Sequence, residues 1–217
     1  MIEHVSLKHQ TNGRRQGVAE AQEMPALGHI IERLTTSVDN AESWIEVVRD
    51  LRAPIPLEFP DIAFNIRWAK KADIMEIAAL EGFVKEIDVM TRSLRHGDRC
   101  ILFEKRGRIG AFAWIAFRDY RLSVWRKLHL PTDAAYLVYI FVRSEFRRKG
   151  VGLYLLRCVM RRLRQMGYTR LFSGMYANWE ASINLHLKAG FRIDKKFLKR
   201  KLLHIIPVPP KKLDVGH

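Results

Sequence analysis

Apolar residues in the second half of the chain follow strand and helix patterns in turn. The unbroken apolar run at residues 136–142 predicts a central strand that is buried on both faces. Apolar residues at helical spacing over 151–166, followed by Gly167, predict a long helix. Residues 170–176 predict the next strand, and a further helix is expected after Asn178, which would be its N-cap, with its end at residues 188–190.

Shorter elements are predicted before and after this segment. Residues 64–68 alternate as a strand does, and residues 74–83 and 84–94 predict two short helices. The remaining expected elements are strands at 100–103 and 109–117 with a hairpin turn at 106–108, a loop at 118–133, and a last strand from 191 to about 206.

The first 60 residues show a different pattern. Residues 1–25 are polar and aperiodic, which predicts poor order. Residues 27–51 carry apolar residues at helical spacing, which predicts one helix, or two helices broken near Asp39. Trp44 would anchor this helix by packing. Its apolar stripe must pack on the main body or on another subunit, so a homodimer is one expectation.

Three parts of the chain are therefore expected. They are a helical extension over 1–60 that ends in a proline-rich linker, a main domain over 61–206, and a tail over 207–217. With 217 residues, 48% of them hydrophobic, the chain is long enough for one good core.

A basic turn with two glycines joins the central strand to the long helix. It reads V-R-S-E-F-R-R-K-G-V-G over residues 142–152. The first N–H groups of a helix have no partner within the helix, and the helix dipole adds positive charge there. Gly150 and Gly152 would let a phosphate ester approach the main chain, and Arg147, Arg148 and Lys149 add formal charge. A pyrophosphate is the ligand this pattern suggests, and an ordinary tight turn with solvated basic residues is the alternative.

Two other phosphate-binding motifs are excluded. The turn lacks the G-x-x-x-x-G-K-[ST] spacing of a P-loop. It also lacks the three-glycine spacing of a dinucleotide fold and an acidic residue about 20 positions further on.

The turn resembles the acyl-CoA loop of the GCN5-related N-acetyltransferases (GNAT). That family usually reads V-x-P-x-[YF]-R-x-[KR]-G-[IV]-G, and Ser144 here replaces the proline. A second block, S-I-N-L-H-L-K-A-G-F over residues 182–191, is similar to the family's late helix. The fainter resemblance covers about residues 62–206 and implies an α/β fold, with a mixed central sheet splayed at the cofactor site and flanked by helices.

The resemblance also implies a reaction and its binding residues. An acetyl or other acyl group would move from acetyl-CoA, or another acyl-CoA, to the amine of a small molecule or peptide. The parallel strands would splay after Val142, and pantetheine would pair with the backbone of Ile140, Phe141 and Val142. The turn amides from Arg147 to Gly152, Val151 included, would hold the pyrophosphate, and Asn178 is placed with this cofactor-binding set.

Proton transfer requires a positioned acid or base. His186 occupies the place where the family most often has a tyrosine that protonates the leaving thiolate, and histidine can do this near neutral pH. The candidates for the general base are Tyr139, Tyr136 and Glu145. We expect Tyr139 and His186 to be the catalytic residues. Residues 136–142 contain no carboxylate.

Other residues suggest packing more than chemistry. Cys158 is expected to be a packed thiol, and Tyr176 and Trp179 either flank the acceptor pocket or fill the core. With only two cysteines and no cluster of histidine and cysteine, we expect no metal site and no disulfide. We expect no membrane span, no signal peptide and a cytoplasmic location.

Charge is distributed unevenly along the chain. The net charge is +15, but residues 1–60 carry −3 and residues 61–217 carry +18. Coenzyme A accounts for part of this field, and an acidic partner such as an acyl carrier protein, RNA or an anionic membrane surface would account for more. A basic surface that is simply solvated is the alternative. No RNA-binding or helix-turn-helix signature supports nucleic acid. The alternatives to an acyl-CoA enzyme are an enzyme that uses carrier-protein thioesters and a non-catalytic module that binds coenzyme A or nucleic acid.

Overall fold

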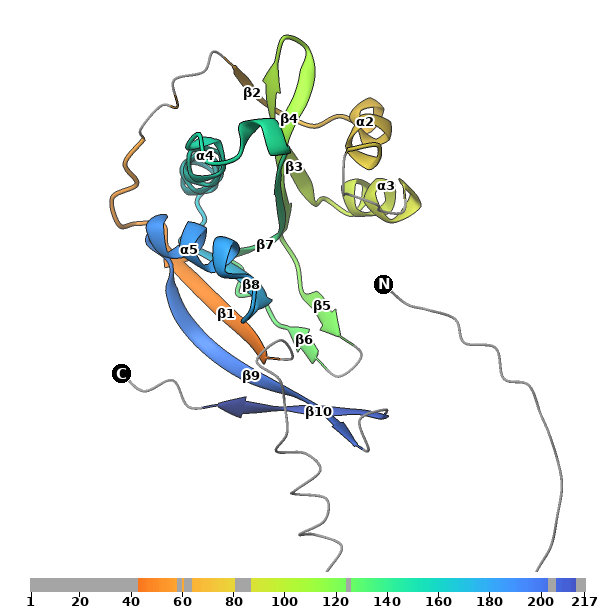
Figure 1. Ribbon diagram of the computed structural model, residues 1–217, viewed down its shortest axis with the longest axis vertical. Coiled ribbons are helices and arrows are strands. Elements are labelled where there is room, and N and C mark those ends of the chain that lie inside the picture. The colour runs from red at the N-terminus through yellow and green to blue at the C-terminus, as the bar shows by residue number, and fades with distance from the viewer. Residues whose placement is uncertain are drawn as a thin grey trace, which may run out of the picture.

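The computed structural model describes residues 43–57, 60, 64–80, 87–123, 126–202 and 206–213. Its strands are β1 (Ser43–Asp50), β2 (Asn65–Trp68), β3 (Arg99–Lys105), β4 (Arg108–Ala116), β5 (Tyr120–Ser123), β6 (Arg126–Leu128), β7 (Ala134–Val142), β8 (Arg170–Tyr176), β9 (Arg192–Leu202) and β10 (Ile206–Leu213). Eight of them form one sheet in the order β10-β9-β1-β8-β7-β4-β3-β2, and β5 pairs with β6 separately (Figure 1). The pairing of β7 with β8 is parallel and the other pairings are antiparallel, so the sheet is mixed.

Helices cover both faces of the sheet. On one side lie the 3₁₀ helix η2 (Lys71–Asp73), α2 (Ile74–Ala78) and α3 (Ile87–Arg95), and on the other lie α4 (Val151–Gln165) and α5 (Glu180–Lys188) (Figure 1). A short 3₁₀ helix, η3 (Ser144–Phe146), precedes α4. Val151, Leu155 and Val159 of α4 are fully buried at four-residue spacing, which confirms the predicted stripe. Arg157 of the same helix is also buried.

The helix predicted up to residue 51 is wrong for residues 43–50. These residues form β1, which lies between β8 and β9 and pairs with both. Ile45, Val47 and Val48 are buried because strands flank β1 on both sides and helices lie against the sheet. Trp44 does pack as an anchor, but from a strand, with its ring edge-on to Tyr176 at a centroid distance of 5.2 Å. Residues 1–42, where the rest of that prediction falls, lie outside the described residues.

Three smaller expectations were also wrong. The loop predicted at 118–133 contains the β5–β6 hairpin. The last strand was expected to end near 206 and a tail to follow, but a second strand, β10, runs through this proline-rich segment. Proline lacks an N–H, and β10 tolerates it because it is an edge strand. The N-cap of α5 is Trp179, not Asn178. The other expected elements are present, and residues 81–86 lie outside the described part.

Candidate active site

A cleft opens where β7 and β8 separate. The two strands pair from Ala134 and Arg170 up to Leu137 and Ser173, and no further. The separation therefore begins after Leu137, earlier than the expected point after Val142. Up to Val142, β7 still pairs with β4, so its other edge is the one that faces the gap. The cavity in this gap has a volume of about 410 Å³, and its lining comprises residues 137–142, Arg147, residues 173–175, Trp179, Ala181, Ser182, Leu185 and His186.

The basic turn lies at the mouth of this cleft. Arg147 lines the cavity and donates from Nε to the carbonyl oxygen of Val142 at 2.9 Å. Gly150, with φ of 77°, is the N-cap of α4, and no side chain caps the helix. The N–H groups of Val151 and Gly152 have no acceptor among the described residues. This helix end is therefore open to an anion.

Gly152 keeps the cleft wall open. A Cβ atom on this residue would lie 3.4 Å from Cγ2 of Val142 and 3.7 Å from Cδ1 of Leu185, and both side chains line the cavity. A larger side chain would therefore project between two cavity-lining residues. Arg148 and Lys149 are exposed beside the turn and do not line the cavity.

His186 lies in the cleft wall and is only 1% exposed. Its Nδ1 lies 2.8 Å from the carbonyl oxygen of Ser182. That oxygen can only accept a hydrogen bond, so Nδ1 carries the proton and the neutral ring has its lone pair at Nε2. Nε2 is buried with no partner among the described residues. Burial lowers the pKa of His186, so at neutral pH the ring is a proton acceptor.

Sequence comparison identifies the family of this domain. The acetyltransferase (GNAT) family model matches residues 64–191, which is more than half of the chain. The chain belongs to the GNAT acetyltransferase family. No curated protein matches the sequence.

Solved structures agree with the GNAT fold. A GCN5-related N-acetyltransferase from Sphaerobacter thermophilus superposes with a TM-score of 0.57 at 15% identity, over 77% of this chain and 53% of that one. A Drosophila protein superposes with a TM-score of 0.52 at 15% identity, over 76% of this chain and 52% of that one. The chain spans about half the length of these two structures. The predicted α/β fold, with its helix-flanked mixed sheet, is confirmed.

The three candidates for the general base lie in different surroundings. Tyr139 lines the cleft, and burial raises its pKa, so its phenol keeps its proton at neutral pH. Tyr136 is buried and stacks on Tyr120 at a centroid distance of 5.2 Å, outside the cleft lining. Glu145 is exposed and pairs with Arg143 at 3.5 Å. The structure thus brings only Tyr139 of these three into the cleft with His186.

The aromatic and cysteine residues divide in a similar way. Trp179 lines the cleft and is 49% exposed, whereas Tyr176 packs between Trp44 and Trp179 and does not line it. Asn178 is exposed and lines a neighbouring hollow with Trp179. Cys158 is packed against the core, and burial raises its pKa. The described residues contain no cluster of side chains suited to a metal ion, and no helix among them is long and apolar enough to cross a membrane.

Sequence reasoning missed a buried carboxylate next to the cleft. Glu46 on β1 is 3% exposed and pairs directly with Gly174 of β8, which lines the cavity. A carboxylate that acts as a general base was expected on the central strand, and residues 136–142 contain none. Glu46 lies far away in sequence, inside a segment interpreted as a helix. Its position between Ile45 and Val47 in a strand-forming run was the one available signal.

Proposed function

We propose that the protein transfers an acyl group, acetyl in the simplest case, from coenzyme A to an amine. The observation that supports this most is the order of the backbone segments along the cleft. β7 pairs with β8 only up to Leu137, so residues 138–142 line the cleft, and the turn and the start of α4, which no side chain caps, follow them in the chain. A pantetheine arm needs amide partners along an extended backbone, and a pyrophosphate needs N–H donors at its end. In this GNAT domain, the backbone of β7 would serve the pantetheine arm, and the N–H groups at the start of α4, which follow it in the chain, would serve the pyrophosphate.

The turn and β7 would hold the cofactor. Arg147 and the N–H groups of Val151 and Gly152 would bind the pyrophosphate, with Arg148 and Lys149 adding charge around it. The backbone of Ile140, Phe141 and Val142 would pair with the pantetheine amides. An N–H near Phe141 or Val142 would also polarise the thioester carbonyl, and losing such a donor typically costs about 3–4 kcal/mol in the barrier.

We infer that His186 moves the proton of the reaction. The amine nitrogen attacks the thioester carbon, the C–S bond breaks, and one proton must pass from nitrogen to sulfur. Since Nε2 holds a lone pair at rest, His186 first accepts the proton from nitrogen and then donates it to the thiolate. The sequence predicted that His186 acts as an acid toward the thiolate, and in this scheme that is the second of its two proton transfers. Tyr139, which keeps its own proton, would act as a hydrogen-bond donor in the cleft.

Glu46 points to the kind of acceptor. A carboxylate buried one strand from the cavity wall attracts a positively charged group, in a chain whose net charge is +15. We infer that it favours an amine that arrives as an ammonium ion and releases one proton to solvent before the neutral nitrogen attacks.

A panel of amines with acetyl-CoA, monitored by thiol release, tests the function. We expect acetyl-CoA to bind by calorimetry and at least one amine to release thiol. In His186→Asn, acetyl-CoA affinity should stay within about twofold, whereas kcat should fall about 10²- to 10⁴-fold. No binding of acetyl-CoA at millimolar concentration would reject the function. A wild-type kcat in the variant would reject only the role of His186.

A second candidate uses thioesters on an acyl carrier protein. It is favoured by the three exposed cations Arg147, Arg148 and Lys149 at the cleft mouth, together with the net charge of +18 over residues 61–217. The same assay with acyl carrier protein thioesters distinguishes the two donors. Binding of coenzyme A with no thiol release from any donor and amine would instead indicate a non-catalytic module.

A further inference from the structure

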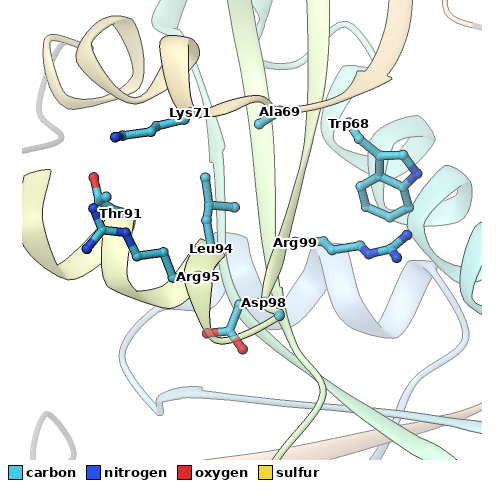
Figure 2. A pocket seen from close by; sticks show the side chains of 9 residues that line it. Trp68, Ala69, Lys71, Thr91, Leu94, Arg95, Asp98 and Arg99 are labelled. Carbon is cyan, nitrogen blue, oxygen red and sulfur yellow. The ribbon is translucent and has the colours of Figure 1, made fainter.

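A second hollow lies near the β2 edge of the sheet, away from the cleft between β7 and β8. It forms where β2 ends and β3 begins, beside the end of α3, and has a volume of about 540 Å³ (Figure 2). It shares no lining residue with the cleft. Since β3 and β4 separate β2 from β7, three strand spacings, or roughly 14 Å, separate the two. The volume is in the range of sites for small molecules.

Three positively charged side chains surround this hollow. Lys71, Arg95 and Arg99 come from η2, α3 and β3, and all are exposed. None has an ion pair within the described ranges. The acid in the lining, Asp98, is 4% exposed and has its own partner, the Arg118 guanidinium at 3.5 Å. Within the described ranges, three cations thus line the hollow with a single carboxylate, which already has a partner.

The helix dipole explains only one of these cations. Arg95 is in the last turn of α3, where the helix dipole favours a positive charge. That reason does not apply to Lys71 or Arg99. Gathering like charges is unfavourable unless a ligand of opposite charge compensates, so the arrangement itself points to an anion.

The wall that carries Arg99 is held firmly. The Trp68 ring has the Arg99 guanidinium 5.5 Å and the Arg162 guanidinium 5.2 Å from its centroid. Arg162 also donates to the carbonyl oxygen of Ile66 at 3.1 Å. Figure 2 shows Lys71, Thr91 and Arg95 on one side of the hollow, and Arg99 and Trp68 on the other, with Leu94 between them. The polar ends of Lys71, Thr91 and Arg95 lie together, whereas the Arg99 guanidinium points away from them toward Trp68 (Figure 2).

We propose that this hollow binds a small phosphate monoester. Its dianionic head would lie beside Arg95, whose planar guanidinium group can offer two donors to phosphate oxygens. The Lys71 ammonium and the Thr91 hydroxyl would complete the donor set. Ala69 and Leu94 would contact the uncharged part of the ligand. This site is separate from the cleft and does not depend on the proposed acyl transfer.

Titration of the full chain with phenyl phosphate and with inorganic phosphate tests the site, by calorimetry and by amide chemical shifts. We expect phenyl phosphate to bind at millimolar concentration or below, with shifts at Thr91 and Arg95. The double variant Lys71→Met/Arg95→Gln should weaken binding at least about tenfold, because two charged donors are lost. Lys71→Met changes one exposed side chain and should weaken binding less. It tests the site if the double variant does not fold. Equal affinity for inorganic phosphate would mean that the uncharged part makes no contact and would overturn the ester specificity.

Two controls locate the binding. Arg108→Gln removes the same charge at the far end of the β3–β4 hairpin and should bind phenyl phosphate as the wild type does. Arg147→Gln changes the turn before α4, the other expected phosphate site, and should also retain binding. The proposal is overturned if phenyl phosphate does not bind at about 10 mM, or if the double variant still binds. It is equally overturned if Arg108→Gln loses binding to the same extent, or if binding is lost in Arg147→Gln instead.

Discussion

Replacing Gly174 with alanine should force Trp44 away from β8. A Cβ atom on Gly174 would lie 2.5 Å from Cζ2 and 2.8 Å from Cε2 and Nε1 of Trp44, far inside contact distance. The indole is a rigid bicyclic ring, and Tyr176 packs against it, so the ring or β1 must move. Overpacking of this kind costs about 1–3 kcal/mol of unfolding free energy. For a chain of this length, that lowers Tm by about 2–12 °C.

Thermal unfolding followed by circular dichroism measures this change. Gly152→Ala is the matched control, because its new methyl group meets its nearest atoms at 3.4 Å and 3.7 Å, which is ordinary contact. Adding Trp44→Leu to Gly174→Ala should recover part of the loss, so the two changes should be non-additive by at least about 0.5 kcal/mol. If Gly174→Ala melts at the same temperature as Gly152→Ala, Trp44 does not pack on Gly174 and the position of β1 is wrong.

Three further predictions concern the cleft. Because burial lowers the pKa of His186, the unfolded chain binds more protons than the folded chain below the ordinary histidine pKa, and the wild-type free energy of unfolding should fall as pH drops through about 6.5, by at most about 1.4 kcal/mol per pH unit. Urea unfolding of His186→Asn should show a smaller fall. The same pH dependence in both proteins would contradict the buried neutral ring. Glu46→Gln should raise KM for an ammonium acceptor about tenfold with kcat retained, since a charged partner is lost; an unchanged KM in steady-state assays would leave Glu46 with a structural role only. Gly150→Ala places a side chain at φ of 77°, so it should lower the free energy of unfolding in urea by about 1–2 kcal/mol and weaken acetyl-CoA binding in calorimetry. Wild-type values for both would mean that Gly150 has no special role in the turn.

The segment from β7 to β8 was predictable because its signals are local. An unbroken apolar run, a helical stripe and a glycine-bearing basic turn each specify their own element, and the strands and the helix agree closely with the structure. The position of His186 in a motif could be read in the same way. Its resting tautomer could not, because the proton position depends on the carbonyl of Ser182 and on burial by distant parts of the chain.

β1 was not predictable from its own residues. Ile45, Val48 and Leu51 fit helical spacing, and tryptophan, isoleucine and valine also favour strands, so periodicity alone was ambiguous. The strand forms because β8 and β9 leave a space between them that only another strand can fill. The strand partner of Glu46, Gly174, therefore lies more than a hundred positions away in the sequence. This non-local pairing puts the Glu46 carboxylate beside the cleft, which the sequence did not predict.

The central place of β1 has a consequence for synthesis. This strand leaves the ribosome first among the described strands, but its neighbours β8 and β9 begin about 120 and 140 residues later, a delay of roughly 6–28 s at typical translation rates. During that time, a short apolar stretch with Trp44 at its start has no sheet to join. The nascent chain must therefore be shielded until both partners emerge, so yield in a cell should depend on chaperone supply more than the stability of the finished fold would suggest.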